Sequence, residues 1–361
     1  MGEVKSGRRV AITWGEASGR EIAAALEREL LAVSPGSSVQ QLNLAGTTGP
    51  VIGFAEALKA AAARRFDVAQ AFRSVMAGQP SVAVLVGYPD FHLLLGLKLR
   101  RAGVPVYWVG PPQFWAWGRF RLGLLRRSAD KVACLFDFEL GPLRRAGITA
   151  AYYGYPLYDS VVAQETRLET LFRLGLQPDE RYVAFMPGSR EAEQRFHVPL
   201  YCRTFGRLRL TVPGLRGVMI CHPAGALPDG MTMATERRYD IIRQADFAVI
   251  ASGTATAEAA ILGVPHVVTY HLSPATRLLA KLVARLHHFA IPNIVAGSRV
   301  VPEFLEPEEG KLVRACLELM RDSADQECVR AGLARVRQRL GPPGAIAAIA
   351  RDVLEMALGS T

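Results

Sequence analysis

The sequence predicts an α/β protein of two domains, each built around a doubly wound parallel sheet. Its 361 residues exceed one comfortable core and suit two domains of roughly 100 to 200 residues each. Short β-branched segments alternate with Ala- and Leu-rich segments of helical periodicity, which is the pattern of a parallel sheet with crossover helices. A polar stretch at residues 164–180 interrupts this alternation, which then begins again.

The first half contains three apolar segments that we expect to form strands. Two of them are followed by amphipathic segments, at residues 21–32 and 93–102, with the apolar spacing of helices. The expected strands are residues 10–13, 82–86 and 104–109.

The second half repeats this order after the polar stretch. Helical patterns at residues 311–320 and 326–340 precede a Gly-Pro-Pro-Gly sequence and a last helix at 345–358. The expected strands are residues 182–185, 217–221, 247–250 and 266–270.

These patterns predict the domain boundaries. Residues 1–163 are expected to form the first domain and residues 164–340 the second, while residues 341–361 form a helix that packs back on the first. Ligands of doubly wound sheets bind beyond the carboxyl ends of the strands, so functional residues should directly follow strands.

Composition and charge narrow the classes of function. Half of the residues are hydrophobic and 21% are charged, as in globular proteins. Lys and Arg number 43 against 33 Asp and Glu, a net charge of +10, which attracts nucleic acid, anionic bilayers or phosphorylated substrates. Nucleic acid is the least favoured of these partners, because no helix-turn-helix, RNP or zinc pattern accompanies the charge.

The five cysteines are widely spaced and form no CxxC pair, which fits neither a disulfide framework nor a zinc site. We therefore expect a reducing cytoplasm. The N-terminus lacks the apolar core and cleavage site of a signal peptide. No run approaches the roughly 20 apolar residues that span a bilayer, so a membrane role would be peripheral.

Two turns in the second half end apolar strands and suit an anionic ligand. The first, from Pro187 to Arg190, combines a Gly/Ser turn with a guanidinium. The second, from Ser252 to Thr254, places small residues at the start of a helix, where backbone N–H groups bind anions. On shape alone, the first is equally an ordinary turn with Ser189 as N-cap. Together they predict a nucleotide-diphosphate pocket without a Walker A lysine or GxGxxG, which disfavours kinases and dehydrogenases.

Acidic residues follow three of the expected strands. Glu258 lies about one helical turn after Thr254 and suits sugar hydroxyls, although a charge near a helix N-terminus is also favourable by itself. Glu16 and Ser18 follow the first strand, where Ser18 is alternatively an N-cap. Asp90 suits a general base, although capping of its own helix is the simpler explanation.

Residues 110–119 pack three aromatic side chains into four positions, and Arg121, Arg126 and Arg127 follow them. Such a segment suits base stacking, an acyl chain or an anionic membrane face; buried core aromatics beside solvated arginines are the alternative. A basic amphipathic helix is predicted at residues 279–289.

Eight short motifs occur along the chain in this order: GEASGR, PDF, PPQFWAW, GYP, PGSR, SGTATAE, IPN and VPEFLE. By these motifs the chain resembles the lipid-A-disaccharide synthases over nearly its whole length. The resemblance implies a GT-B-like fold, with two Rossmann-like parallel-sheet domains facing a central cleft. It also implies transfer of 2,3-diacylglucosamine from its UDP conjugate to 2,3-diacylglucosamine 1-phosphate in lipid A biosynthesis.

The resemblance further implies the partners of the protein. They are a UDP-sugar donor, an acylated glucosamine phosphate acceptor and the inner-membrane surface, to which the protein would bind peripherally from the cytoplasm. No metal, organic cofactor or nucleic acid is implied, and a homodimer is compatible with the family.

The resemblance assigns UDP binding to eight residues and catalysis to three. Arg190 would stabilise the departing UDP, while Asp90 or Glu16 would take the proton from the 6-hydroxyl of the acceptor. The UDP-binding residues would be Gly188, Ser189, Arg190, Ser252, Gly253, Thr254, Glu258 and Asn293.

Four positions depart from the family pattern. Gly87 stands where the family has the first aspartate of D-x-P-D-F, its leading candidate for the base. Arg20, Tyr155 and Glu306 replace the aspartate of GEASGD, a histidine and a glutamine. Because the UDP-side motifs are kept, we expect UDP-sugar binding with altered, slow or lost disaccharide synthesis. The alternatives are a transferase with a different acceptor and a non-catalytic, membrane-associated nucleotide-sugar-binding protein.

Overall fold

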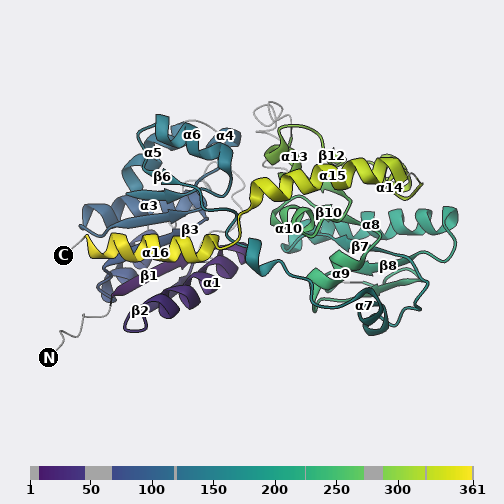
Figure 1. Ribbon diagram of the computed structural model, residues 1–361, viewed down its shortest axis with the longest axis horizontal. Helices are drawn as coiled ribbons and strands as arrows, with labels where there is room; N and C mark the ends of the chain where they lie inside the picture. The colour runs from purple at the N-terminus through teal and green to yellow at the C-terminus, as the bar shows by residue number, and fades with distance from the viewer. Residues whose placement is uncertain are drawn as a thin grey trace, which may run out of the picture. The chain divides into compact units, whose positions relative to one another are not determined.

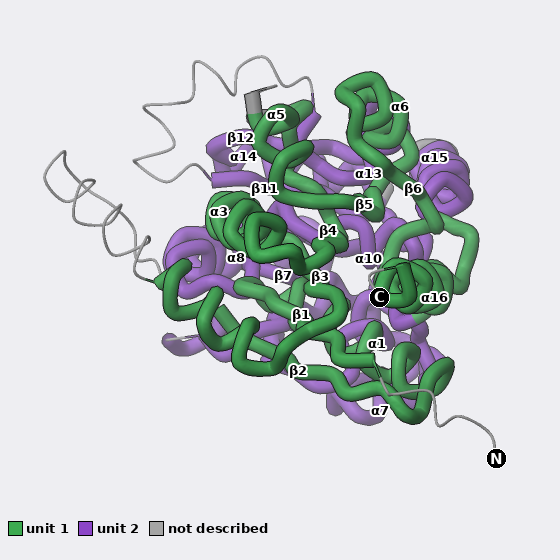
Figure 2. Tube along the Cα trace, turned by 90° about the vertical axis from the view of Figure 1, so that its left-hand side faces the viewer, with its two compact units in different colours: residues 1–159, 341–361 green, residues 160–340 purple. Residues whose placement is uncertain are grey.

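The structure, a computed structural model, describes residues 8–44, 67–117, 120–223, 225–271, 288–321 and 323–359. The chain divides into two compact units (Figure 2). The first unit comprises residues 1–159 together with residues 341–361, and the second comprises residues 160–340. Each unit contains a six-stranded sheet in which every neighbouring pair is parallel. The predicted α/β fold class is confirmed.

The sheet of the first unit has the strand order β2-β1-β3-β4-β5-β6. Its central strands are apolar and buried on both faces; all five residues of β3, for example, are buried. The chain reverses its direction across the sheet between β1 and β3, so a topological switch point lies there. The strands are β1 (Arg9–Trp14), β2 (Ser38–Asn43), β3 (Val82–Val86), β4 (Val106–Val109), β5 (Lys131–Ala133) and β6 (Ala150–Ala151).

The last helix of the chain, α16 (Ala345–Leu358), belongs to this first unit and lies beside α1 (Figure 1). A buried carboxylate on α16, that of Asp352, accepts hydrogen bonds from Tyr107 and Tyr153, each 2.7 Å long, and forms an ion pair with Lys131. The other helices of the unit are α1 (Ala17–Val33), α3 (Pro89–Arg101), α4 (Phe114–Trp117), α5 (Phe120–Ser128) and α6 (Asp137–Arg145).

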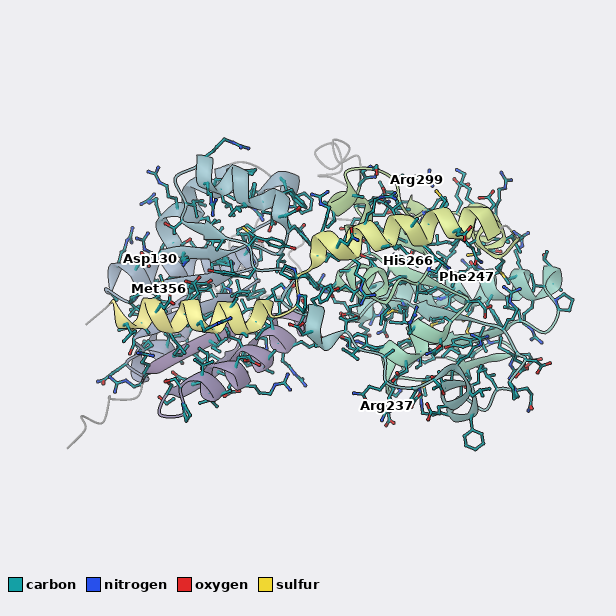
Figure 3. The ribbon with its side chains drawn as sticks, viewed as in Figure 1. Asp130, Arg237, Phe247, His266, Arg299 and Met356 are labelled. Carbon is teal, nitrogen blue, oxygen red and sulfur yellow. The ribbon has the colours of Figure 1, made fainter. Side chains whose placement is uncertain are left out.

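The sheet of the second unit has the strand order β12-β11-β10-β7-β8-β9, so its switch point lies between β7 and β10. His266 and Phe247, the first residues of β11 and β10, mark the amino-terminal edge of this sheet (Figure 3). The strands are β7 (Tyr182–Met186), β8 (Arg216–Met219), β9 (Met231–Met233), β10 (Phe247–Ala251), β11 (His266–Tyr270) and β12 (Glu303–Leu305).

Helices pack around this second sheet, with α14 against α8 and with α13 and α15 against α10. Buried aromatic side chains of α8, Tyr201 and Phe205, contact Phe185 of β7 and form the centre of one core cluster. The helices are α7 (Arg167–Arg173), α8 (Glu191–Thr211), α9 (Arg238–Gln244), α10 (Thr254–Leu262), α13 (Ile291–Ala296), α14 (Glu309–Arg321) and α15 (Ser323–Leu340).

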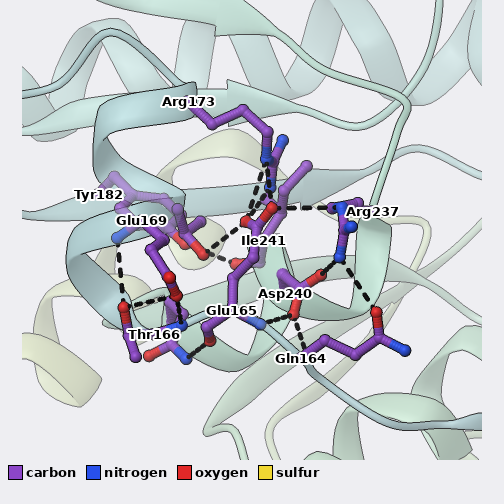
Figure 4. Close-up of polar contacts among 11 residues, drawn as sticks. Gln164, Glu165, Thr166, Glu169, Arg173, Tyr182, Arg237, Asp240 and Ile241 are labelled. Atoms are coloured by element: carbon purple, nitrogen blue, oxygen red, sulfur yellow. Dashed lines mark hydrogen bonds and ion pairs between the residues drawn. The ribbon is translucent and has the colours of Figure 1, made fainter.

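An ionic network fixes the first residues of the second unit to α9 (Figure 4). The carboxylate of Asp240 accepts hydrogen bonds from the backbone N–H groups of Gln164 and Glu165. Arg173 binds both carboxylate oxygens of Glu165, and Arg237 lies 3.3 Å from the same carboxylate. The hydrogen bonds from Arg173 are the main cause that lowers the pKa of Glu165. These contacts hold α7 and α9 together through the segment that precedes α7.

Candidate functional site

The turn after β7 has a backbone that only glycine adopts easily. Gly188 has a φ of +101°, and a Cβ at this position would lie 2.3 Å from Oε2 of Glu193. The carbonyl of Gly188 accepts a hydrogen bond of 3.0 Å from Gln194 on α8. The turn is therefore held from its own helix, with its backbone close to the carboxylate of Glu193.

Arg190 ends this turn and forms the N-cap of α8. Its backbone N–H donates to Glu193, 3.3 Å away, and its guanidinium lies 3.5 Å from the same carboxylate. The side chain of Arg190 is 64% exposed, and Ser189 beside it is exposed as well. A planar cation at the start of a 21-residue helix can bind a phosphate through two parallel hydrogen bonds.

The second predicted turn follows β10, the strand that pairs with β7, so both turns lie at the switch point. Ser252 is fixed on two sides: its N–H donates to Thr269 at 2.7 Å, and its hydroxyl donates to the carbonyl of Phe289 at 3.1 Å. Gly253 is the N-cap of α10, and a Cβ there would have no neighbour within 4 Å. Gly253 directly precedes Thr254 and the first amide groups of α10, where an anion can bind.

Glu258 is buried within α10, and its carboxylate lies 3.3 Å from the guanidinium of Arg238 on α9. The ion pair balances the buried negative charge. The contact of Glu258 with a ribose diol stays a prediction, because the ion pair with Arg238 already explains how this carboxylate can be buried.

Asn293 on α13 is fully buried, and backbone groups of its own unit occupy its amide. Its Oδ1 accepts from the N–H groups of Val300 and Val301 at 2.7 and 2.9 Å, and its Nδ2 donates to the carbonyl of Val301 at 2.9 Å. In this structure Asn293 therefore holds the loop before β12, and its contact with UDP stays a prediction.

The sequence singled out Glu306 only as a departure from the family pattern and missed its pairing with His271 at the carboxyl ends of β11 and β12. His271 donates a hydrogen bond of 2.8 Å from Nδ1 to Glu306, and Phe196 of α8 stacks on the imidazole with ring centroids 3.6 Å apart. Glu303 in β12 accepts hydrogen bonds from the N–H groups of Phe289 and Ala290. The rule that functional residues follow strands could have found His271, which directly follows β11.

The first unit brings its own two predicted turns together at its switch point. Glu16 is the N-cap of α1 and is exposed. The turn after β1 contacts the turn after β3, because a Cβ on Gly15 would lie 2.4 Å from the ring of Tyr88. Ser18 lies in the first turn of α1 and is half-buried.

Gly87 and Tyr88 both have left-handed backbones, with φ of +55° and +48°. His92 fixes this turn: Nδ1 donates to the carbonyl of Gly87 at 2.7 Å, and Nε2 accepts from the hydroxyl of Thr13 at 2.9 Å. Burial lowers the pKa of His92 to about 4, so the imidazole is neutral. A Cβ on Gly87 would have no neighbour within 4 Å, so the turn leaves room for a side chain there.

Asp90 lies in the first turn of α3 and pairs with Arg121 on α5, with 3.0 Å between Oδ1 and Nη2. Its side chain is 62% exposed. The carboxylate is therefore accessible to a ligand. To act as a base, however, it must accept a proton while it is paired with the guanidinium of Arg121.

The aromatic segment at residues 110–119 is partly core. Trp115 donates from Nε1 to Glu139 at 3.1 Å, and this fully buried carboxyl has its pKa raised to about 7 by burial. Tyr155, at the family's histidine position, is 2% exposed and stacks on Phe136. The basic helix predicted at residues 279–289 lies almost wholly outside the described residues.

Within the described ranges, no group of three or more His, Cys, Asp or Glu side chains could hold a metal ion. The same part of the chain contains no helix long and apolar enough to cross a membrane.

Two doubly wound parallel sheets, one in each unit, are typical of the GT-B fold, and solved structures of that class match this chain. MnaA of S. aureus, solved with UDP, has a TM-score of 0.66 at 13% identity and covers 98% of both chains. MurG of Acinetobacter baumannii has a TM-score of 0.56 at 15% identity and covers 97% of this chain and 99% of its own. These likenesses establish the fold.

The family follows from sequence comparison. The family model described as lipid-A-disaccharide synthetase matches residues 11–332. A lipid-A-disaccharide synthase of Geobacter sulfurreducens is 34% identical over 96% of this chain and 97% of its own length. A second, from Solibacter usitatus, is 30% identical over 96% and 98%. The chain belongs to the lipid-A-disaccharide synthase family and is a glycosyltransferase of lipid A biosynthesis.

Proposed function

We propose that the protein transfers 2,3-diacylglucosamine from its UDP conjugate to 2,3-diacylglucosamine 1-phosphate, which gives a β-1,6-linked disaccharide and UDP. The observation that carries the donor half is the pair of turns at β7 and β10. One turn requires glycine at position 188 and ends in an exposed guanidinium, and the other opens onto the start of α10 at Gly253. Two such turns on neighbouring strands suit a diphosphate.

The second unit supplies the charge stabilisation in this mechanism. As the bond from the anomeric carbon to the phosphate oxygen breaks, the electron pair leaves with UDP. Arg190 and the first amide groups of α10 stabilise the negative charge that develops on the phosphate. Direct attack by the acceptor hydroxyl from the opposite side inverts the anomeric carbon.

The first unit supplies the proton acceptor. The 6-hydroxyl of the acceptor must lose its proton as the new carbon–oxygen bond forms. Glu16, exposed at the N-cap of α1, and Asp90, exposed in the first turn of α3, are the two carboxylates that we assign to this step. Of the two, Asp90 carries the additional cost of its ion pair with Arg121.

A second candidate function rests on Gly87, because this glycine leaves the turn after β3 without the carboxylate of the family pattern. A protein that keeps the donor site but changes the proton acceptor can use a different acceptor, or bind UDP-sugar without transfer. We give the disaccharide reaction precedence because the family match covers the whole site-bearing sequence.

The test is turnover of the two diacylated substrates by the purified protein in detergent, comparing Arg190→Ala with Arg195→Ala. Arg195 is a matched control, because it lies on the same helix, is 76% exposed and pairs with Glu191. Arg190→Ala should lower kcat/KM by about 10²-fold, the usual loss for one charge-stabilising donor, and Arg195→Ala should change it less than twofold. Consumption of donor without disaccharide would support a different acceptor.

The place of action is part of the proposal. Both substrates carry acyl chains, and the net charge of +10 favours an anionic surface, so the protein would act as a peripheral protein on the cytoplasmic face of the inner membrane. Sedimentation with anionic vesicles, and its loss at high salt, tests this location. A homodimer is tested by light scattering in detergent.

A further inference from the structure

Glu306 and His271 form a polar pair at the carboxyl edge of the second sheet that the proposed mechanism does not use. Glu306 follows β12 directly, and His271 follows β11. Nδ1 of His271 lies 2.8 Å from Oε2 of Glu306, and the two side chains are 21% and 36% exposed. The carboxylate is thus oriented by an imidazole and remains accessible to a ligand.

Contacts place this pair beside the turn that ends in Arg190. The N–H of Glu306 donates to the carbonyl of Tyr270 at 2.8 Å. Burial raises the pKa of Tyr270 and so does the charge of Glu193, while Arg190 lowers it, so the phenol lies within electrostatic range of both charged groups.

A second set of contacts gives the same location. Phe196 on α8 stacks face to face on His271. The next residue, His197, donates from Nδ1 to the carbonyl of Glu193 at 3.0 Å. Burial lowers the pKa of His197 to about 4; His271 lowers it slightly further and Glu306 raises it slightly, so this ring lies within electrostatic range of the pair. His271 and the loop that ends in Arg190 thus both contact the N-terminal part of α8.

The chemistry of a carboxylate decides which part of the donor it can contact. A carboxylate only accepts hydrogen bonds, so it would repel the diphosphate and pair well with a sugar hydroxyl. Glutamine, the residue of the family pattern, has an N–H group that can donate to a carbonyl. The change to Glu306 therefore converts this position from a mixed donor and acceptor into an acceptor alone.

We propose that Glu306 accepts a hydrogen bond from a free hydroxyl of the sugar carried by UDP and is a specificity-determining residue for the donor. His271 is a positioning residue, since its hydrogen bond fixes the orientation of the carboxylate. The inference rests on the proposed donor site at β7 and β10. On UDP-linked 2,3-diacylglucosamine the free hydroxyls are those at positions 4 and 6, because positions 2 and 3 carry acyl groups and position 1 is bonded to UDP.

Calorimetric titration of the full chain with UDP, UDP-N-acetylglucosamine and its 4-deoxy and 6-deoxy derivatives tests this inference without turnover. A hydrogen bond to a charged acceptor corresponds to a tenfold or larger change in affinity. We expect the wild type to bind the parent sugar at least about tenfold more tightly than one of the deoxy derivatives. In Glu306→Ala this ratio should fall to about one, while the Kd for UDP changes less than about twofold.

Two further variants separate a direct contact from a structural effect. Glu306→Gln keeps the size of the side chain and a neutral acceptor, so its ratio should be intermediate. His271→Ala should reduce the ratio and leave the Kd for UDP unchanged. Glu309→Gln is the matched control, because it removes a carboxylate three residues further on that pairs with Arg203, and its ratio should equal that of the wild type.

The outcomes discriminate between the inference and the donor site on which it rests. If no deoxy derivative binds more weakly than the parent sugar, or if the ratio survives in Glu306→Ala and Glu306→Gln, the inference is wrong while the donor site stands. A parallel loss of UDP affinity in both variants also overturns it, since the carboxylate would then act through the fold of the turn. Absence of UDP binding by the wild type would instead refute the donor site.

Discussion

Replacing Gly188 with alanine tests the donor turn most sharply. The backbone at this position has a φ of +101°, which costs an L-residue about 1–3 kcal/mol. The new Cβ would also lie 2.3 Å from Oε2 of Glu193 and 2.9 Å from its Cβ. Glu193 must therefore move, and the contacts at 3.3 and 3.5 Å that orient Arg190 are lost with it.

The magnitude follows from these two effects. Losing the orientation of one guanidinium on a phosphate removes a charge-assisted pair of hydrogen bonds, about 1.5–3 kcal/mol. We therefore expect the Kd for UDP to rise by about 10- to 100-fold in Gly188→Ala, as measured by calorimetry. Gly175→Ala is the control, because Gly175 has a φ of +70° but open space around a Cβ.

The control separates general backbone strain from damage to the site. Gly175→Ala should lower stability by a similar strain energy, seen as a lower midpoint of thermal unfolding, with the Kd for UDP unchanged. If Gly188→Ala binds UDP as tightly as Gly175→Ala does, the turn after β7 does not hold the diphosphate, and the reasoning from its geometry fails.

Two further predictions concern the first unit. Gly87→Asp should raise kcat for disaccharide formation at least tenfold over Gly87→Asn, because both variants share the left-handed backbone and open space but only aspartate can accept a proton; equal rates would exclude this position as the missing base. Burial lowers the pKa of His92 from 6.5 to about 4. Between pH 4 and pH 6.5 the unfolded chain therefore binds more protons than the folded chain. The stability that depends on a neutral His92 is complete above pH 6.5 and is lost as the pH falls towards 4. His92→Gln should therefore flatten the pH dependence of the free energy of unfolding in that window by up to ~1.4 kcal/mol per pH unit; an unchanged slope would contradict a neutral, buried imidazole.

The buried central strands are the part of the fold that the sequence predicts well. β3 and β11 occupy the expected ranges, because runs of β-branched residues buried on both faces leave a continuous apolar signal. β2 is missed because its residues, including Gln40 and Gln41, are only half-buried and its place comes from pairing with β1. The two-residue β6 is too short to leave a pattern of its own.

Site residues, too, can be predicted where they follow a buried apolar strand and are missed where they follow a short or polar one. The strand-end rule leads to Arg190, Ser252 and Gly253, because each follows a strand that the sequence predicts. It does not lead to Glu306, because β12 is short and mixed in character, with no apolar pattern to announce it. Nor can the sequence indicate that the amide of Asn293 is bonded to its own loop, since this depends on backbone groups seven and eight residues away.

Hydrogen–deuterium exchange with and without UDP locates the donor site, because it reports where the nucleotide binds rather than whether it binds. We expect UDP to slow exchange at residues 188–194, after β7, and at residues 253–257, at the start of α10, with little change around Gly175 or in α16. Protection confined to other segments, with none at these two turns, would contradict a donor site at the switch point of the second sheet.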